Sequence, residues 1–191
     1  MAGQSTGKVL IAMGVCGAGK SALARTLSAR LDLALVDADD HHSDEARAAM
    51  SRGEALSDAE RLPWLDRVAA AAEAAAQARG GVVIACSALR RIYRDRLRSH
   101  LPGAFFIHLT GERDLIASRL ATRRDHFVGL PLLDSQLATL EPLGADENGM
   151  TVDVTASIEL LSEAVLRKMG DAAAASLETG PGLDTIEIRQ N

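Results

Sequence analysis

Aromatic residues and cysteines are scarce in this 191-residue sequence. Aromatic side chains make up only 3% of the chain, and its formal net charge is -5. A nucleic-acid groove needs a basic surface and aromatic rings for base stacking, so this composition argues against nucleic acid as a partner. The two cysteines, Cys16 and Cys86, are too few for a disulfide framework and suit a reducing compartment.

Long hydrophobic runs are also missing. No stretch approaches the roughly 18 to 20 uninterrupted apolar residues that a membrane-spanning helix needs. The first residues, Met1 to Lys8, are small and polar and lack the apolar centre of a signal peptide. We therefore expect a cytoplasmic protein with no membrane partner.

Apolar runs of strand length alternate with helix-like stretches. The expected strands are Val9–Met13, Leu33–Val36, Val82–Ala85, Phe105–Leu109 and Thr151–Val154. The expected helices are Ser21–Leu31, Leu65–Ala78, Leu89–His100, Asp114–Arg124 and Ile158–Met169. This alternation predicts an α/β fold, a three-layer α/β/α sandwich around a five-stranded parallel sheet with its ligand site at the carboxyl ends of the strands.

The chain is expected to form one domain over residues 1–169. Its hydrophobic content of 47% is enough to bury the core of one domain, and a second full domain is not expected. From Gly170 the composition changes to Ala, Ser, Gly and Pro, so we expect residues 170–191 to form a mobile C-terminal extension. The strand-like piece Thr185–Arg189 could instead add an edge strand or contact a partner.

A glycine-rich segment between the first expected strand and the first expected helix fits the phosphate-loop pattern G-x-x-x-x-G-K-[ST]. Its residues are Gly14, Val15, Cys16, Gly17, Ala18, Gly19, Lys20 and Ser21. The glycines let successive N–H groups point inward, the helix presents its positive end, and Lys20 can reach the terminal phosphates. Ser21 would bind Mg²⁺ through its hydroxyl. The pattern predicts a nucleoside triphosphate site rather than a turn that binds nothing.

An acidic cluster, Asp37-Ala38-Asp39-Asp40-His41-His42, follows the second expected strand. Residues two apart in a strand face the same way, so Asp37 and Asp39 are expected to project together toward the phosphates. One carboxylate would hold Mg²⁺ and the other would accept a proton from an attacking hydroxyl. Two other interpretations stay open, a polar turn that caps the next helix and a transition-metal site that uses His41 and His42.

Further segments accompany these two motifs in a recognisable order. They are Gly53-Glu54-x-Leu56-x-Asp58, Arg61-x-Pro63-Trp64-Leu65, Cys86-Ser87-Ala88-Leu89-Arg90, Tyr93-Arg94-Asp95, His126-Phe127 and Leu132-Leu133-x-Ser135-Gln136. From Val9 to Lys168 the chain resembles the gluconate kinases, which are similar in fold to shikimate and adenylate kinases and phosphorylate D-gluconate. The resemblance implies ATP and Mg²⁺ as cofactors, a small sugar-acid substrate, a homodimer and a small helical lid around residues 119–140.

The resemblance also implies roles for individual residues. Asp39 would be the base beside the acceptor hydroxyl, with Asp37 on the Mg²⁺ side. Arg61 would meet the substrate carboxylate, because a guanidinium offers two parallel donors to a planar carboxylate. Ser87 and His42 would contact sugar hydroxyls, although His42 could equally cap a helix or lie at the surface.

A second group of expected site residues lies later in the chain. Arg119 and Arg123 are four residues apart, hence on one helix face, and would stabilise charge on the transferring phosphoryl group. His126, at the start of the lid-like stretch, is expected to face the substrate. Arg94 is expected to contact the substrate too, although it could instead belong to a solvated charged stripe on its helix.

The sequence departs from the family pattern in the segment His42–Met50. An asparagine and a lysine of that pattern are replaced by Ala46 and Ala49, and Asp125 stands where the family has glycine. Loss of a hydrogen bond to the acceptor would change substrate preference. Two alternatives to a gluconate kinase therefore stay open: a kinase of another hydroxy acid, such as shikimate or another aldonate, and a non-catalytic nucleotide-binding regulatory module.

Overall fold

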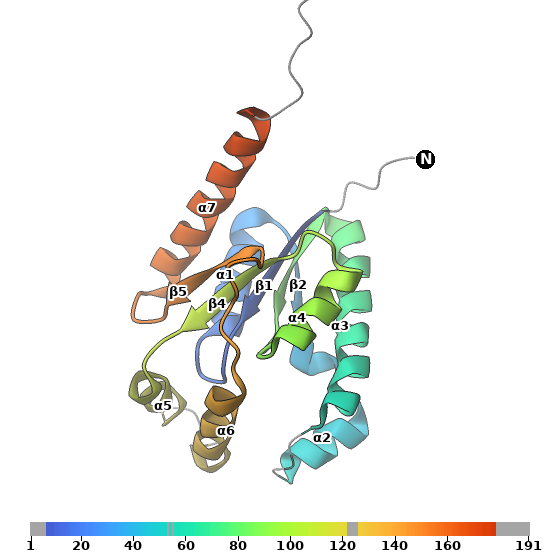
Figure 1. Ribbon diagram of the computed structural model, residues 1–191, viewed down its shortest axis with the longest axis vertical. Helices are drawn as coiled ribbons and strands as arrows, with labels where there is room; N and C mark the ends of the chain where they lie inside the picture. The colour runs from blue at the N-terminus through green and yellow to red at the C-terminus, as the bar shows by residue number, and fades with distance from the viewer. Residues whose placement is uncertain (1–6, 53, 55, 122–125, 179–191) are drawn as a thin grey trace, which may run out of the picture.

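A five-stranded parallel sheet forms the centre of the computed structural model, which describes residues 7–52, 54, 56–121 and 126–178 (Figure 1). Its strands are β1 (Lys8–Met13), β2 (Ala34–Asp37), β3 (Gly81–Ala85), β4 (Phe105–Thr110) and β5 (Gly149–Asp153). They lie in the order β2-β3-β1-β4-β5. The predicted strands are confirmed, and each boundary shifts by two residues at most.

Helices cover both faces of the sheet. The helices that cover the sheet are α1 (Lys20–Leu31), α3 (Asp58–Arg79), α4 (Arg91–His100) and α7 (Ile158–Glu178), and the others are η1 (Ala38–His41), α2 (Asp44–Ser51), α5 (Arg113–Ala121) and α6 (His126–Thr139). α3 and α4 pack against Val9, Ile11 and Met13 of β1. α1 and α7 pack against the opposite side, where Leu10 and Ala12 point. The predicted three-layer α/β/α fold is therefore confirmed. Among the described residues, none of the helices has the length and hydrophobicity that a membrane span requires.

α3 begins at Asp58, seven residues before the expected start at Leu65. The reason is a cap at its first turn, where the Glu60 carboxylate accepts hydrogen bonds from the Ser57 N–H at 2.7 Å and the Ser57 hydroxyl at 2.6 Å. This Ser-x-x-Glu arrangement satisfies backbone donors that have no partner within the helix. The early start places Arg61 on the helix, close to the carboxyl edge of the sheet.

α7 also differs from the expectation, because it continues to Glu178 beyond the expected end at Met169. The added residues include a run of alanines, which have the highest intrinsic helix propensity. The predicted extension over residues 170–191 therefore starts as helix, and Thr185–Arg189 lies outside the described residues. α5 is described as far as Ala121, and the rest of the expected helix, up to Arg124, lies outside the described residues.

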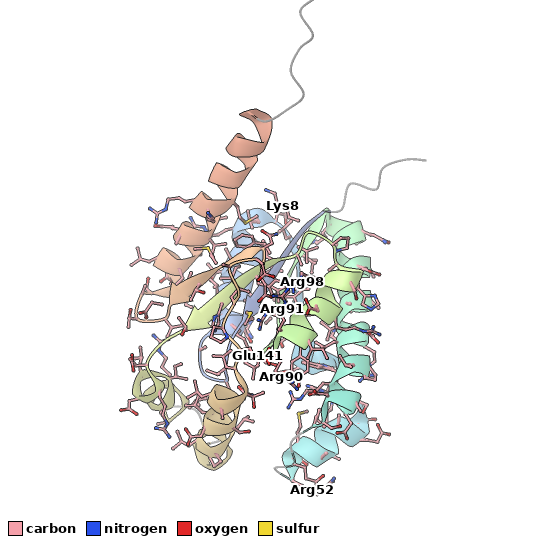
Figure 2. The ribbon with its side chains drawn as sticks, in the orientation of Figure 1. Lys8, Arg52, Arg90, Arg91, Arg98 and Glu141 are labelled. Atoms are coloured by element: carbon pink, nitrogen blue, oxygen red, sulfur yellow. The ribbon has the colours of Figure 1, made fainter. Side chains whose placement is uncertain are left out.

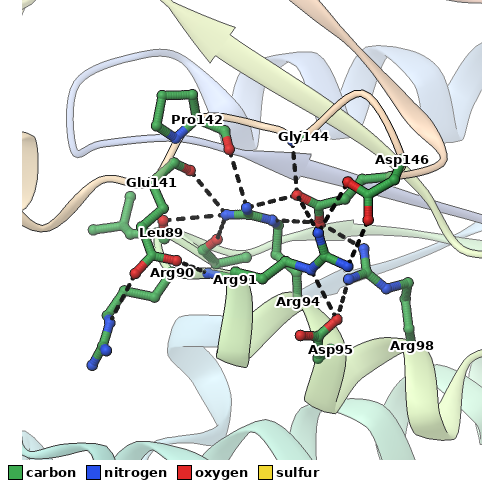
Figure 3. A network of polar contacts seen from close by, with 12 residues as sticks. Leu89, Arg90, Arg91, Arg94, Asp95, Arg98, Glu141, Pro142, Gly144 and Asp146 are labelled. Carbon is green, nitrogen blue, oxygen red and sulfur yellow. Dashed lines mark hydrogen bonds and ion pairs between the residues drawn. The ribbon is translucent and has the colours of Figure 1, made fainter.

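A buried ion pair joins α4 to the segment that leads into β5 (Figure 3). Arg94 and Glu147 have side chains only 1% exposed, and the guanidinium donates to both carboxylate oxygens at 2.8 and 2.7 Å. Its other N–H groups donate to the carbonyls of Ala88, Leu89, Glu141 and Pro142. Figure 2 labels side chains that surround this junction, including Arg90, Arg91, Arg98 and Glu141.

These contacts correct the expectation for Arg94. The side chain does not line the cleft described below, and it does not belong to a solvated stripe, because its donors are used inside the protein. Its role is to hold the backbone of Ala88 and Leu89, just after β3. Ala88 has a positive φ of 42°, an unfavourable conformation for a residue with a Cβ, so this segment needs such support.

We expect Arg94→Met to lower the free energy of unfolding by about 3 to 5 kcal/mol, because it leaves the buried Glu147 carboxylate without its main partner. Urea unfolding followed by circular dichroism measures the change. Arg96→Met is the matched control: Arg96 lies on the same helix and makes a bidentate pair with Asp66 at the surface, so its loss should cost about 0 to 1 kcal/mol. Equal losses in the two variants would contradict the structural role of Arg94.

The same ion pair predicts a pH dependence of stability. Burial raises the pKa of Glu147, but hydrogen bonds from Arg94, the Gly144 N–H and Arg98 outweigh this and lower the pKa to about 2. The unfolded chain therefore binds the proton more readily, and the stabilisation, complete above the ordinary glutamate pKa of 4.5, is lost as the pH falls toward 2. Acid titrations at several urea concentrations should show a shallower loss of stability for Glu147→Gln than for the wild type.

Candidate functional site

The candidate site lies at the carboxyl edge of the sheet. The strand register pairs Asp37 of β2 with Ala85 of β3, and Ala85 with Ala12 of β1, so these three strands end side by side. A cleft of about 690 Å³ opens there, between the loops that follow the strands and helices α2, α3 and α6. In parallel α/β sheets this edge is the usual position of a ligand site.

The predicted phosphate loop connects β1 to α1. Its first glycine, Gly14, has φ of 138°, and a Cβ there would lie 2.6 Å from the Leu109 carbonyl oxygen. The Gly14 N–H donates to the Ser87 carbonyl at 3.2 Å, which ties the loop to the end of β3. Gly17 also has a positive φ, 79°, and a Cβ would meet Leu120 of α5 at 2.7 Å. Glycine is therefore required at both positions by conformation and by close packing.

Lys20 and Ser21 open α1 and line the cleft. The Lys20 ammonium donates to the Val15 carbonyl at 2.9 Å, so the side chain folds back over the loop. Burial lowers the pKa of Lys20, and the negative charge of Asp39 is the strongest influence in the opposite direction. The positive charge of the loop thus faces the acidic cluster across the cleft.

Asp37 and Asp39 both line the cleft, but not for the reason that the sequence suggested. β2 ends at Asp37, and Asp39 belongs to the short helix η1, so the alternation of side chains in a strand does not relate them. Asp37 instead caps η1, because its Oδ1 accepts the Asp39 N–H at 3.2 Å. The alternative interpretation as a helix cap is therefore correct for Asp37, although its Oδ2 also accepts the Ser21 hydroxyl at 3.1 Å.

The oxygens of Ser21 and Asp37 fit a magnesium ion better than a transition metal. They are hard ligands, one from the first turn of α1 and one from the end of β2, and Mg²⁺ is typically held by one or two such groups together with water and phosphate oxygens. In the described part of the chain, no group of three or more His, Cys, Asp or Glu residues could hold a metal ion. The transition-metal interpretation of His41 and His42 therefore finds no support there.

His42 lies in the wall of the cleft rather than at the surface. Its imidazole stacks on Trp64 with ring centroids 4.4 Å apart and an angle of 7°, and its side chain is 7% exposed. Trp64 is fixed by a hydrogen bond from its Nε1 to the Ala38 carbonyl at 2.8 Å. Burial lowers the pKa of His42, and Arg47 and Arg61 lower it further against the opposing charge of Asp39. A neutral imidazole can both donate and accept, which suits contact with a hydroxyl group.

Arg61 and Ser87 line the same cleft. The Arg61 Nε donates to the Leu56 carbonyl at 3.0 Å, and the guanidinium carbon lies 5.8 Å from the centroid of the Tyr93 ring. Tyr93 is held in turn by Asp58, which accepts from its hydroxyl. These contacts fix the guanidinium at the wall. Its two terminal nitrogens make no hydrogen bond within the described residues, so they can pair with an anionic ligand.

Of the later group of expected site residues, only Arg119 has a side chain among the described residues. Arg119 is on α5 and donates from Nη2 to the Val154 carbonyl at 2.5 Å, and it is not among the residues that line the cleft. Arg123 lies outside the described residues. His126 is the first residue of α6, but its side chain is outside the described part of the structure. The roles predicted for these three residues remain predictions.

Several polar residues of the cleft were not identified as site residues from the sequence, and Arg47 and Gln136 are two of them. Arg47 of α2 lines it and donates to the carbonyls of Asp40 at 2.7 Å and His42 at 3.2 Å. Gln136 of α6 lines it too, and its side-chain oxygen accepts the Cys16 N–H at 2.6 Å. A sequence signal existed for Arg47, because Ser43 caps α2 and defines a helix beside the acidic cluster. Gln136 belongs to the family pattern quoted above, but no chemical role was assigned to it from the sequence.

Comparisons with known proteins agree with this arrangement. A family profile described as an AAA domain matches residues 9–143. The probable gluconokinase of Rattus norvegicus is 37% identical over 179 residues, which cover 84% of this chain and 97% of that protein. The thermoresistant gluconokinase of Escherichia coli (strain K12) is 40% identical over 152 residues, with 79% and 87% coverage.

A solved structure extends the similarity to three dimensions. The crystal structure of a gluconokinase from Sinorhizobium meliloti 1021 superimposes with a TM-score of 0.80 at 33% identity, and the match covers 92% of this chain and 99% of that one. Similarity therefore spans most of the described domain and includes the phosphate loop, the acidic cluster and the walls of the cleft. The chain belongs to the gluconokinase family of phosphate-loop kinases.

Proposed function

We propose that this protein transfers the γ-phosphoryl group of ATP to a hydroxyl of D-gluconate and produces 6-phosphogluconate. The observation that carries the proposal is the content of one cleft: a phosphate loop, two carboxylates and a guanidinium with unused donors all line it. Relatives at 36 to 40% identity are named gluconokinase or probable gluconokinase, which supports gluconate as the acceptor.

The phosphate loop would bind the ATP phosphates through its backbone N–H groups and Lys20. Mg²⁺, which would be held by the Ser21 hydroxyl and the Asp37 carboxylate, would neutralise part of the phosphate charge. The hydrogen bond between these two residues already places both oxygens at the carboxyl edge of the sheet. Lys20 lines the same cleft as these two residues, which supports the proposal because phosphoryl transfer depends mainly on positioning and charge stabilisation.

On the acceptor side, Arg61 would pair with the carboxylate of gluconate, and His42 and Ser87 would contact its hydroxyls. Asp39 would accept the proton of the attacking hydroxyl. Its side chain is 89% exposed at the cleft, so an acceptor hydroxyl can reach it. The new bond forms between that hydroxyl oxygen and the γ-phosphorus, while the bond from phosphorus to the bridging oxygen breaks and ADP leaves.

The roles of the lid residues and the homodimer rest on the family resemblance, and the cytoplasmic location rests on the composition of the sequence. Arg119, Arg123 and His126 would complete the site from the lid, and Arg119 would have to exchange the Val154 carbonyl for a phosphate oxygen. The protein would act in the cytoplasm as a homodimer. Sedimentation of the purified protein tests the homodimer directly.

Release of ADP from Mg-ATP with a panel of acceptors tests the reaction. The panel contains gluconate, shikimate, other aldonic acids, glycerate and no acceptor. We expect gluconate to stimulate release most strongly. Stronger stimulation by another acid would contradict gluconate as the acceptor. The different acceptor preference would then be attributed to the altered segment around Ala46 and Ala49. Slow release that no acid stimulates would favour the regulatory module.

Lys20→Ala should lower kcat by roughly 10² or more, because it removes a positioned charge that stabilises the transferring phosphoryl group. The steady-state rate with saturating ATP and acceptor measures the loss. Lys8→Ala is the control, since Lys8 is exposed at the opposite end of β1 (Figure 2). An active Lys20→Ala variant would refute the assignment of the phosphate loop.

Arg61→Lys should raise the KM for gluconate roughly tenfold or more and leave the KM for ATP unchanged, because lysine cannot present two parallel donors to a carboxylate. Arg67→Lys is a matched control on the same helix. Arg67 also donates from Nε to a backbone carbonyl, that of His41, but it does not line the cleft. A rise in the KM for ATP instead would place Arg61 on the nucleotide side of the cleft.

A further inference from the structure

The carboxylate of Asp39, the proposed base, is held in place only through its backbone. Its side chain is 89% exposed, and its Oδ1 lies 3.9 Å from the Nε2 of His42, which is longer than a hydrogen bond. Within the described residues its carboxylate oxygens accept no hydrogen bond, whereas its N–H donates to the Oδ1 of Asp37 at 3.2 Å. The position of this carboxylate therefore depends on how firmly η1 and the residues after it are fixed.

Side chains from α2 and α3 hold the carbonyl groups of this segment, residues 38–42. Carbonyls at the end of a helix have no partner within it, and positively charged donors are favourable there. The hydrogen bonds run from Trp64 to the Ala38 carbonyl at 2.8 Å, from Arg67 to that of His41 at 3.0 Å, and from Arg47 to those of Asp40 at 2.7 Å and His42 at 3.2 Å. Of these three donors, only Arg47 binds two carbonyls and comes from α2.

Arg47 reaches both carbonyls because of its place on α2. Side chains of a helix lean toward its N-terminus, and Arg47 lies one turn after Ser43, the residue that caps this helix. Its Nε and Nη2 lie on one edge of the planar guanidinium and bind carbonyls two residues apart, so they fix the turn between η1 and α2. No residue of α2 is buried, so this turn depends on such contacts rather than on a core.

We infer that Arg47 is a positioning residue: by bridging the carbonyls of Asp40 and His42, it holds the end of η1 so that the carboxylate of Asp39 faces the acceptor hydroxyl. The inference rests on the proposed function, in which Asp39 accepts the proton of that hydroxyl. Because a displacement of about 1 Å of a reacting group can lower a rate by roughly 10², loss of the bridge should reduce the rate of the chemical step.

Substitutions of Arg47 test the bridge through the steady-state rate. Arg47→Met removes both hydrogen bonds and should lower kcat roughly tenfold, while the KM values for gluconate and ATP stay unchanged. Arg47→Lys keeps the positive charge but lacks the planar fork that spans two carbonyls, so its kcat should fall nearly as far. Arg52→Met is the control, because Arg52 pairs with Glu54 just after α2 and does not line the cleft.

The fluorescence of Trp64 gives a second measurement that needs no activity. Trp64 is the only tryptophan of the chain, and the imidazole of His42 covers its ring. When the His42 carbonyl loses its donor, the imidazole should leave the stack, so acrylamide should quench the ligand-free Arg47→Met protein more strongly than the wild type or Arg52→Met. The melting temperature should not change, because Arg47 is exposed and α2 buries no residue.

Two kinetic results would overturn the inference. A raised KM for gluconate with an unchanged kcat in Arg47→Met, or full activity of Arg47→Lys, would show that Arg47 acts through its charge on the acceptor. Unchanged quenching of Trp64 in Arg47→Met would also overturn it. None of these results would contradict the proposed function. If no acid stimulates the wild type, the proposed function is refuted, and the quenching alone decides whether Arg47 holds the segment.

Discussion

The parallel register of β2, β3 and β1 is the constraint on which the candidate site depends. It places Asp37, Ala85 and Ala12 in one row, so the segments that follow them must emerge at the same edge of the sheet. Hydrogen bonds then join these segments directly, from Gly14 to the Ser87 carbonyl and from Ser21 to Asp37. A shift of one residue in any pair would turn the side chains to the opposite face and separate the two oxygens that suit Mg²⁺. The geometry of the site is therefore set mainly by the buried sheet.

Arginine residues illustrate how environment, rather than residue type, decides between structural and binding roles. Arg94 is buried, and its guanidinium is used by Glu147 and four carbonyls, so it has no capacity left for a ligand. Arg61 uses only its Nε within the described structure and presents the rest of its guanidinium to the cleft. Removing a buried charge from water is costly unless every donor is satisfied, which explains why Arg94 has so many partners. Arg61 avoids that cost because the cleft is open to solvent.

The features that were predictable from the sequence are those set by local pattern. Strands buried on both faces read as continuous apolar runs, and the phosphate loop has a fixed spacing, so the sheet and the loop were found. The roles of Asp39 and Arg94 depend on where a strand ends and on what packs over a helix, and neither is encoded locally. α6 was not predicted from local pattern, although the family resemblance implied a helical lid around residues 119–140. It contains Gly129 and Pro131, which disfavour helices, and the burial of Leu133 overrides that preference. Gln136 acquires its partner only through that packing.

If the protein has the proposed function, the altered segment of α2 is the part of the cleft that would select the acceptor. None of the residues of this helix is buried, so its position depends on side-chain contacts rather than on a core. Arg47 provides two of these contacts, to the carbonyls of Asp40 and His42, and both Arg47 and Met50 line the cleft. Positions 46 and 49 carry only methyl groups, which can exclude water but cannot bind a hydroxyl. Of the residues of α2 that line the cleft, Arg47 thus provides the polar group. An acceptor that binds this guanidinium must carry an anionic or hydroxyl oxygen at the end that faces α2.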